Sequence, residues 1–208
     1  MVVSSAMGAN VRLPDVSVPD ELLLRLRLRG MVEDDAGAAS GPLVAAGFAV
    51  RRQTMLALTP AGRAEAERYF RLDVNGETFA AIRAGYEKFL PLNATLIRLC
   101  HDWQVRSGGG PNDHADTHYD WGVIDRLVAL DEQVGPVARR LARDSPRFAG
   151  YRERLRTARS RVEGGDHVWF VSPRHDSYHT VWMELHEDLL LALGVERGAE
   201  GADGEPDA

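Results

Sequence analysis

The sequence predicts a mainly α-helical protein with one small β-hairpin near its N-terminus. Two short apolar runs separated by a polar turn, within residues 48–58, indicate the hairpin. Beyond residue 86, apolar residues recur at helical spacing through almost the whole chain. The 208 residues, 44% of them hydrophobic, suffice for one large domain or two small ones.

Composition excludes several classes of protein. The single cysteine, Cys100, can form neither a disulfide framework nor a thiolate zinc cluster. The chain has no long uncharged apolar run, and its N-terminus lacks a basic segment followed by such a run. We therefore expect a soluble, cytoplasmic protein that does not enter a membrane.

The two ends of the chain are predicted to lie outside the folded part. Residues 1–17 are interpreted as a loose leader. Residues 194–208 hold five acidic residues against one arginine and few apolar side chains, which predicts a disordered acidic tail. The remaining 24 basic and 26 acidic residues nearly cancel, so the formal charge of −6 says little about partners.

The first predicted helix covers residues 21–30 (ELLLRLRLRG), after Pro19 and with Gly30 at its end. Its apolar face would consist of Leu22, Leu23, Leu26 and Met31. Because Leu and Arg alternate over residues 24–29, this stretch also fits a strand, and that alternative stays open.

The next informative passage is GFAVRRQTMLALTPAGR, residues 47–63. Residues 48–51 and 55–58 predict the two strands of the hairpin, with a tight polar turn between them. Thr59 and Pro60 then have the residue types typical of the N-cap and first position of a helix, which we expect to run to about Leu72.

This order of a helix, a short segment, a hairpin and an LTPAGR return resembles the winged helix-turn-helix of MarR-like bacterial regulators. The resemblance is confined to residues 18–72. It implies an N-terminal winged-helix domain that contacts DNA with arginines of the first helix and the wing. The candidates are Arg25, Arg29, Arg51 and Arg52, for which solvated surface is the alternative interpretation.

The segment that would hold the DNA-reading helix is short and acidic. Only residues 31–46 separate the first helix from the hairpin, whereas two helices and a turn need on the order of 20 residues. The segment has no Lys or Arg, and it contains Glu33, Asp34 and Asp35. A short DNA-reading segment with acidic side chains would be repelled by the phosphates of DNA.

The second half of the chain predicts a helical bundle over residues 86–193, after a linker or a continued helix over residues 73–85. Apolar stripes at helical spacing and Ser-Pro pairs predict four helices, over residues 91–106, 116–141, 146–163 and 173–193. Tyr178 and Trp182 would face inward on the last of them.

All seven histidines lie beyond residue 100, and a first cluster lies in NDHADTHYDW, residues 112–121. If this stretch is helical, His114 and His118 share a face at the spacing that lets two imidazoles bind one divalent metal ion. His114 and Asp116 are also candidate acid–base residues. The alternative is an acidic first turn of a helix, with the histidines merely exposed.

A second cluster lies in DSYHTVWMELHE, residues 176–187. His179 could perform acid–base chemistry with Asp116 or Glu184, whereas core packing is the alternative. A pocket for a small molecule would be lined by Tyr119, Trp121, Tyr178, Trp182 and His186. The segment is also similar to one in actinobacterial proteins that share the winged-helix start, which implies a common architecture and no particular reaction.

A third feature is a run of nine arginines against two acidic residues between residues 139 and 161. On a helix, Arg152, Arg156 and Arg159 would share a face opposite the apolar stripe. This face could bind a phosphate-bearing ligand or an acidic partner. We interpret it as a solvated face.

Two functions follow from these patterns. The first is a ligand-responsive, MarR-like transcriptional regulator that binds DNA and a small molecule and forms a homodimer. The alternative is a repurposed winged-helix enzyme that acts on a small molecule through His and Asp acid–base or metal chemistry in the bundle. The sequence contains no P-loop, GxGxxG, HExxH or GxSxG motif, so it does not support the chemistries that depend on them.

Overall fold

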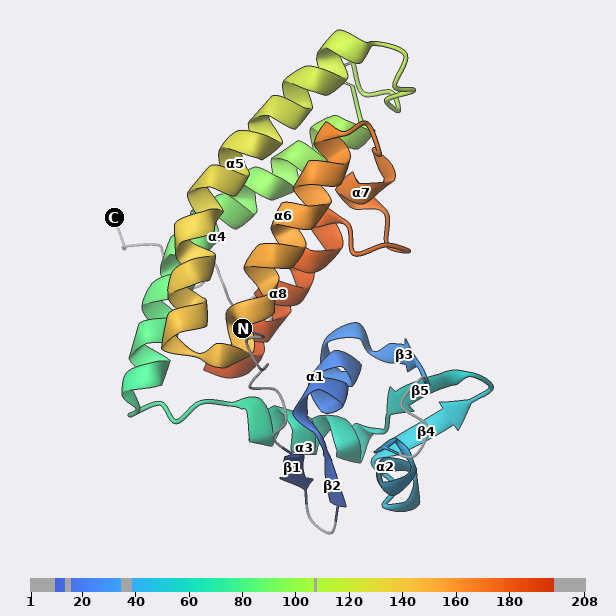
Figure 1. Cartoon of the computed structure of the whole chain (residues 1–208), viewed down its shortest axis with the longest axis vertical. Helices are drawn as coiled ribbons and strands as arrows, with labels where there is room; N and C mark the ends of the chain where they lie inside the picture. The colour runs from blue at the N-terminus through green and yellow to red at the C-terminus, as the bar shows by residue number, and fades with distance from the viewer. Residues whose placement is uncertain (1–9, 14–15, 35–38, 107, 197–208) are drawn as a thin grey trace, which may run out of the picture. The chain divides into compact units, whose positions relative to one another are not determined.

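The protein is mainly helical and has a small three-stranded antiparallel sheet (Figure 1). The computed structural model describes residues 10–13, 16–34, 39–106 and 108–196. The chain divides into two compact units. The N-terminal unit comprises residues 1–73 together with residues 190–208, and the helical unit comprises residues 74–189.

The described elements of the N-terminal unit alternate between short strands and helices. In chain order they are β1 (Asn10–Leu13), β2 (Val16–Pro19), α1 (Asp20–Arg29), β3 (Met31–Glu33), α2 (Gly41–Ala45), β4 (Ala49–Arg52), β5 (Met55–Leu58) and α3 (Pro60–Phe70). Strands β1 and β2 pair antiparallel, in a region where the sequence predicted a loose leader. The predicted acidic tail falls outside the described residues from position 197 onward.

The three-stranded sheet has the order β3–β5–β4, and both pairs are antiparallel. Strands β4 and β5 form the predicted hairpin, which turns at Gln53 and Thr54, with Gln53 in the left-handed region at φ +56°. Alternation along β5 buries Leu56 and Leu58. The observed pairing of β4 with β5 confirms the predicted hairpin. The sequence could predict it because the turn and the period-two pattern depend only on neighbouring residues.

Helix α1 confirms the first predicted helix and excludes the alternative strand over residues 24–29. It buries Leu22, Leu23 and Leu26, and Gly30 adopts φ +75° directly after it, as a C-terminal glycine commonly does. The prediction for Met31 was wrong. Met31 begins β3 and is 49% exposed, because the chain has left the helix and its side chain points to the open face of the sheet.

The start of α3 is as predicted, and it fixes the hairpin to the helix. Thr59 Oγ1 accepts a hydrogen bond from the Gly62 N–H at 3.1 Å and donates to the Gly47 carbonyl at 2.8 Å. The Thr59 N–H donates to the Phe48 carbonyl at 2.9 Å. A Cβ atom placed on Gly62 would lie 1.9 Å from that same carbonyl oxygen, so only glycine fits here.

The described elements of the helical unit are α4 (Glu77–Gln104), α5 (Thr117–Asp144), the short 3-10 helix η2 (Pro146–Phe148), α6 (Ala149–Glu163), α7 (Val168–Val171) and α8 (Tyr178–Leu193), whose last residues belong to the N-terminal unit. Helix α5 packs against both α4 and α6 (Figure 1). The apolar stripes predicted for these helices are buried, with Leu96, Leu127, Leu155 and Leu185 each at most 1% exposed.

Two predicted helix starts were wrong. Pro91 lies inside α4, which begins at Glu77, so residues 77–85 are helical, which was one of the two alternatives for residues 73–85. The Ser172–Pro173 pair does not open the last helix. Ser172 instead follows α7, and the Ser177 hydroxyl accepts a hydrogen bond from the Thr180 N–H at the start of α8. No helix of the described residues is both long enough and apolar enough to cross a membrane.

The junction at Gly62 generates a prediction about stability. We expect Gly62→Ala to lower the free energy of unfolding by about 2 kcal/mol or more, because the new methyl group would overlap the Phe48 carbonyl. Urea unfolding followed by far-ultraviolet circular dichroism measures this. Gly41→Ala is the matched control, since nothing lies within 4 Å of a Cβ at that position. Equal stability of the two variants would contradict the close approach.

Candidate functional site

A polar site of the helical unit centres on His114, in the segment between α4 and α5. The Nδ1 atom of His114 lies 2.9 Å from Oδ2 of Asp120, in the first turn of α5. The other carboxylate oxygen of Asp120 accepts a hydrogen bond from Asn112 Nδ2 at 2.8 Å. The side chain of Asp120 is buried, whereas that of His114 is 40% exposed.

The contact with Asp120, at 2.9 Å against 3.2 Å for the contact of Asn112 Nδ2 with the same ring nitrogen, favours a proton on Nδ1 of His114. An ionised carboxylate only accepts hydrogen bonds, so the contact with Asp120 requires an N–H at Nδ1. The other nitrogen, Nε2, then has its lone pair available when the imidazole is neutral. A buried carboxylate that orients an imidazole in this way is the arrangement that general bases use.

The backbone at His114 is strained. Its φ angle is +59°, in the left-handed region that residues other than glycine rarely adopt. The conformation is held locally, because Asn112 Oδ1 accepts from the His114 N–H and Asp113 Oδ1 accepts from the Ala115 N–H. Asn112 is in turn tied to the end of α4 by a hydrogen bond to the Trp103 carbonyl at 3.1 Å.

Aromatic rings form one wall of the site. The ring of Trp103 contacts those of His114, His167 and Phe170, with centroid distances of 4.5, 5.2 and 4.7 Å. Nearby, Arg106 forms an ion pair with Asp116 at 2.9 Å and lies over the ring of Tyr119. Side chains from both ends of the 105–116 segment therefore fix the surroundings of His114.

Asp116 has a structural role here, and its hydrogen bonds and ion pair are with residues other than His179, the histidine with which it was predicted to pair. It is the N-cap of α5, and its Oδ1 accepts a hydrogen bond from the Tyr119 N–H at 3.1 Å. The Arg106 guanidinium, followed by this backbone hydrogen bond, lowers the pKa of the Asp116 carboxyl. Asp120 is the carboxylate that the prediction missed. Its spacing from Asn112 and His114 gives no signal, because the intervening turn is not helical.

The spacing behind the predicted divalent-metal site is absent. His114 precedes α5 and His118 lies within it, so the two side chains do not share a helix face. Within the part of the chain that the structure describes, no group of three or more His, Cys, Asp or Glu side chains is placed to hold a metal ion.

The predicted small-molecule pocket around α8 is filled by the core. Tyr178 and Trp182 are fully buried, and Trp182 stacks on Phe89 with ring centroids 4.8 Å apart. Trp182 Nε1 donates to Asn93 Oδ1 at 2.9 Å. His186 is also buried and contacts the ring of Phe89, so packing, the alternative interpretation, is the one observed.

The remaining predicted pocket residues lie apart from that core. Trp121 is 47% exposed on α5, and the Tyr119 hydroxyl donates to the Asp102 carbonyl at 2.9 Å. Burial lowers the pKa of His179. The carboxylate predicted to pair with it on α8, Glu184, pairs with Arg154 of α6 at 2.7 Å.

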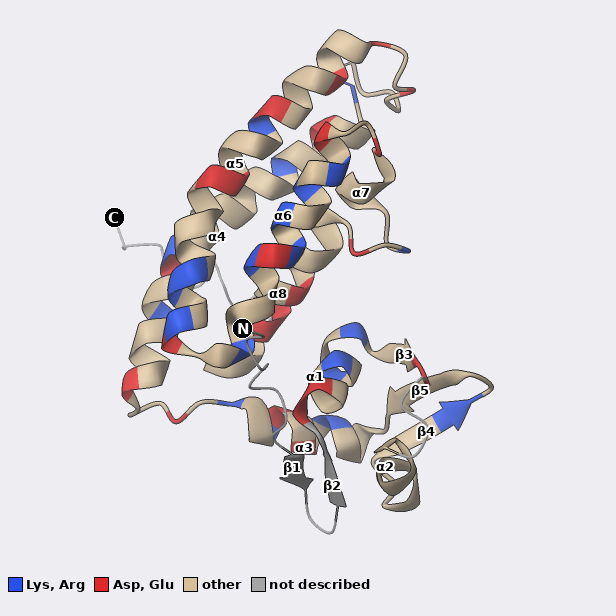
Figure 2. Ribbon diagram, viewed as in Figure 1, with Lys and Arg blue, Asp and Glu red and all other residues tan. Residues whose placement is uncertain are grey.

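The interpretation of the arginine face as solvated was wrong for Arg152 and Arg159, because their carboxylate partner is distant in sequence, whereas Arg156 is exposed. Figure 2 shows basic residues along α6, beside acidic residues of α5 and α8. Arg152 donates to the wholly buried Asp131 of α5 at 2.7 Å, and Arg159 lies 3.6 Å from the same carboxylate. Arg147, just before α6, forms an ion pair with the buried Asp188 of α8. Arg156 pairs only locally with Glu153 among the contacts of the described residues.

The predicted DNA-contacting arginines differ in their surroundings. Arg51 is held against Asp34, with which it forms an ion pair, and it donates to Ser40 Oγ at 2.9 Å. Hydrogen bonds from Ser40 and Arg51 lower the pKa of Asp34. Arg52 is exposed at the end of β4, next to the hairpin turn. Arg25 is half-buried and Arg29 is exposed, both on α1.

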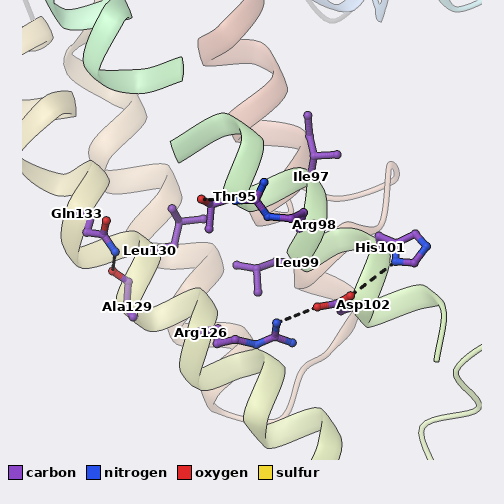
Figure 3. Close-up of a pocket in the computed structure, with 10 residues that line it drawn as sticks. All are labelled: Thr95, Ile97, Arg98, Leu99, His101, Asp102, Arg126, Ala129, Leu130 and Gln133. Atoms are coloured by element: carbon purple, nitrogen blue, oxygen red, sulfur yellow. Dashed lines mark hydrogen bonds and ion pairs between the residues drawn. The ribbon is translucent and has the colours of Figure 1, made fainter. Parts of the chain in front are cut away.

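Sequence patterns also missed a groove between α4 and α5, with a volume of about 670 Å³ (Figure 3). Its polar lining consists of Thr95, Arg98, His101 and Asp102 of α4 with Arg126 and Gln133 of α5. Arg98 and Asp102 are four residues apart, which places them on one helix face. That spacing alone would have indicated only an ordinary surface pair.

The His114 site generates a prediction about the imidazole tautomer. In the neutral form of the wild-type protein, we expect His114 to be protonated at Nδ1, because Asp120 accepts that proton's hydrogen bond. In Asp120→Asn, the preference should shift toward protonation at Nε2. Nitrogen-15 chemical shifts of the imidazole report the tautomer directly. Asp116→Asn is the control, and an identical tautomer in the wild type and Asp120→Asn would contradict the assignment.

Comparison with known proteins found no matching family model, no matching curated protein and no matching solved structure. Relatives therefore assign no function to the site or to either unit. Conclusions about function depend on the chain's own residues and their arrangement.

Proposed function

We propose that this protein is a DNA-binding transcriptional regulator of winged-helix type that responds to a small ligand. The observation that carries the proposal is the order α1–β3–α2–β4–β5–α3 with a sheet of order β3–β5–β4. In winged helices, the hairpin formed by the last two strands is the wing, and a helix before it faces DNA. Under this proposal, the β4–β5 hairpin would be the wing.

The proposed DNA contacts are mainly with phosphate groups. Helix α2, in the place of the reading helix, has only five residues and no basic side chain. The wing offers the exposed Arg52 beside its turn, and α1 offers Arg29 at its end. Contacts of this kind position a protein on DNA without reading base edges, so we propose weak sequence preference and strong salt dependence.

The helical unit would carry the response to the ligand. Helices α4, α5, α6 and α8 have the long apolar stripes of a helical bundle, and we propose that two copies of the protein associate through this unit. A regulator needs a second state that its ligand favours, and a groove on the surface of two packed helices can couple binding to helix positions.

A second candidate, an enzyme, is favoured by one specific contact. The 2.9 Å contact between Asp120 and His114 leaves Nε2 of a neutral imidazole available as a base or nucleophile. His114 is partly exposed, so a small molecule could reach it. Under this alternative, the winged-helix part would serve as a scaffold, and the chemistry would be that of the imidazole.

The regulator proposal predicts a specific pattern of DNA binding. We expect the protein to bind double-stranded DNA fragments, with an affinity that falls steeply between about 50 and 200 mM salt. Arg52→Ala should weaken binding and make the slope of log affinity against log salt shallower by about 1, since it removes one phosphate contact. Fluorescence anisotropy with labelled genomic fragments, including the protein's own upstream region, measures both.

Two further variants make this test specific. Arg143→Ala is the control, because Arg143 is exposed on α5 of the helical unit and should leave DNA affinity unchanged. Arg51→Ala is a poorer probe, since it also breaks the contacts with Asp34 and Ser40 that support the hairpin. Absence of binding at low salt, or equal affinity of Arg52→Ala and the wild type, would refute the proposal.

The enzyme candidate predicts esterase-like reactivity that depends on the His114–Asp120 pair. If it is correct, the protein accelerates hydrolysis of p-nitrophenyl acetate, and His114→Asn abolishes the acceleration. Asp120→Asn should reduce it by about 10-fold or more, because the imidazole loses its orientation. Release of p-nitrophenolate is followed by absorbance. His118→Asn is the control, because His118 is an exposed histidine on α5. If His114→Asn hydrolyses the ester as fast as His118→Asn does, His114 has no special role.

A further inference from the structure

The groove between α4 and α5 has the size and lining of a site for a small molecule. Its volume of about 670 Å³ lies within the range of ligand pockets, which is roughly 300–1,000 Å³. Its apolar lining consists of Ile97, Leu99, Ala129 and Leu130, of which Leu99 and Leu130 are buried at its base and Ala129 is exposed. The side chain of Ile97 is 59% exposed.

The charges in the groove favour an anion. Two guanidinium groups line it, Arg98 of α4 and Arg126 of α5, against the single carboxylate of Asp102. Arg126 Nη1 donates to Asp102 Oδ2 at 2.8 Å, and this bond is drawn in Figure 3. Asp102 also lies 3.6 Å from His101 Nδ1. The lining therefore holds two permanent positive charges and one imidazole against one carboxylate.

The arginines are positioned from two helices. Arg126 is oriented by Asp102 across the interface between α4 and α5, and it also contacts the Gly122 carbonyl at 3.3 Å. Arg98 donates to Thr95 Oγ1 at 3.2 Å, one turn before it on α4. The Arg126 hydrogen bond lowers the pKa of Asp102, so that this carboxyl stays ionised and keeps holding the guanidinium. Such held guanidiniums suit recognition of a carboxylate, sulfonate or phosphate group.

We propose that the α4–α5 groove binds small molecules that carry an anionic group attached to an apolar body. The anion would lie between Arg98 and Arg126, and the apolar part would contact Ile97 and Ala129, the exposed apolar residues of the lining. This inference deepens the ligand-responsive part of the proposed function, since it identifies the site and the chemical class of the ligand. It does not depend on whether the protein binds DNA.

A matched pair of fluorescent probes tests the class of ligand. 8-Anilinonaphthalene-1-sulfonate carries a sulfonate, whereas N-phenyl-1-naphthylamine has the same aromatic body without charge. Both increase in emission when water is excluded, so titration of the full-length protein gives two dissociation constants. We expect the anionic probe to bind at least about tenfold more tightly than the neutral one, which is the effect of one charge-assisted hydrogen bond.

Three variants place the probe in the groove. Ala129→Trp fills an exposed position of the lining and should abolish binding of the anionic probe. Arg126→Gln should weaken it about tenfold and leave the neutral probe unaffected. Asp102→Asn removes the one negative charge and should strengthen it roughly threefold to tenfold. Arg143→Gln, on α5 outside the groove, is the control and should bind as the wild type does.

The outcomes separate the alternatives. Loss of binding in Ala129→Trp with tighter binding in Asp102→Asn, in variants whose circular dichroism matches the wild type, supports the proposal. Binding unaffected by Ala129→Trp would place the probe elsewhere and overturn it. Equal affinity of the wild type for the anionic and the neutral probe would show that the guanidinium groups do not recognise the anion, and it would also overturn the proposal. Because no DNA is present, failure here leaves the winged-helix proposal standing, and failure of DNA binding leaves the groove unaffected.

Discussion

The helical unit depends on a carboxylate that three helices share. Asp131 of α5 is wholly buried, accepts hydrogen bonds from Arg152 of α6 at 2.7 Å and Tyr178 of α8 at 3.2 Å, and lies 3.6 Å from Arg159. Burying a charge costs several kcal/mol unless its partners compensate, so the three helices must keep the positions that maintain these contacts with Asp131.

Asp188 of α8 is a second buried carboxylate of this kind, and its partners are Arg147 and the Tyr151 hydroxyl. Burial raises the pKa of Asp188, and the Arg147 guanidinium opposes that rise.

Because of these buried ion pairs, the arginine-rich part of the sequence does not indicate a basic surface. Much of the positive charge around α6 is directed inward at carboxylates of α5 and α8, so it does not form a surface for a polyanion. Arginines that could bind a ligand therefore lie on faces other than the one that α6 packs against α5 and α8. The α4–α5 groove and the β4–β5 hairpin are two such places, and each presents few arginines rather than a broad basic patch. Both proposals therefore concern contacts with one or a few anionic groups.

How far the sequence predicted the molecule depended on the range of each signal. The β4–β5 hairpin and the Thr59 cap of α3 were found because turn, period and cap are all set by neighbouring residues. Pro91 misled because its ring lies on the exposed side of α4, where an interior proline is tolerated. The role of the α6 arginines and the Asp120 partner of His114 could not be predicted, since each requires knowing which helices pack and where a left-handed residue turns the chain.

The His114 site is where local structure and chemistry are most in tension. A left-handed histidine costs on the order of 1–3 kcal/mol, and Asn112, Asp113 and Asp120 hold it with hydrogen bonds. A chain needing only a turn between α4 and α5 could place glycine there, as it does at Gly109 in the same connection. The strain instead delivers an oriented, partly exposed imidazole against Trp103. That outcome is costly for a surface turn and useful for a group that meets a ligand, so the His114 site and the groove together make the helical unit the place to look for small-molecule chemistry.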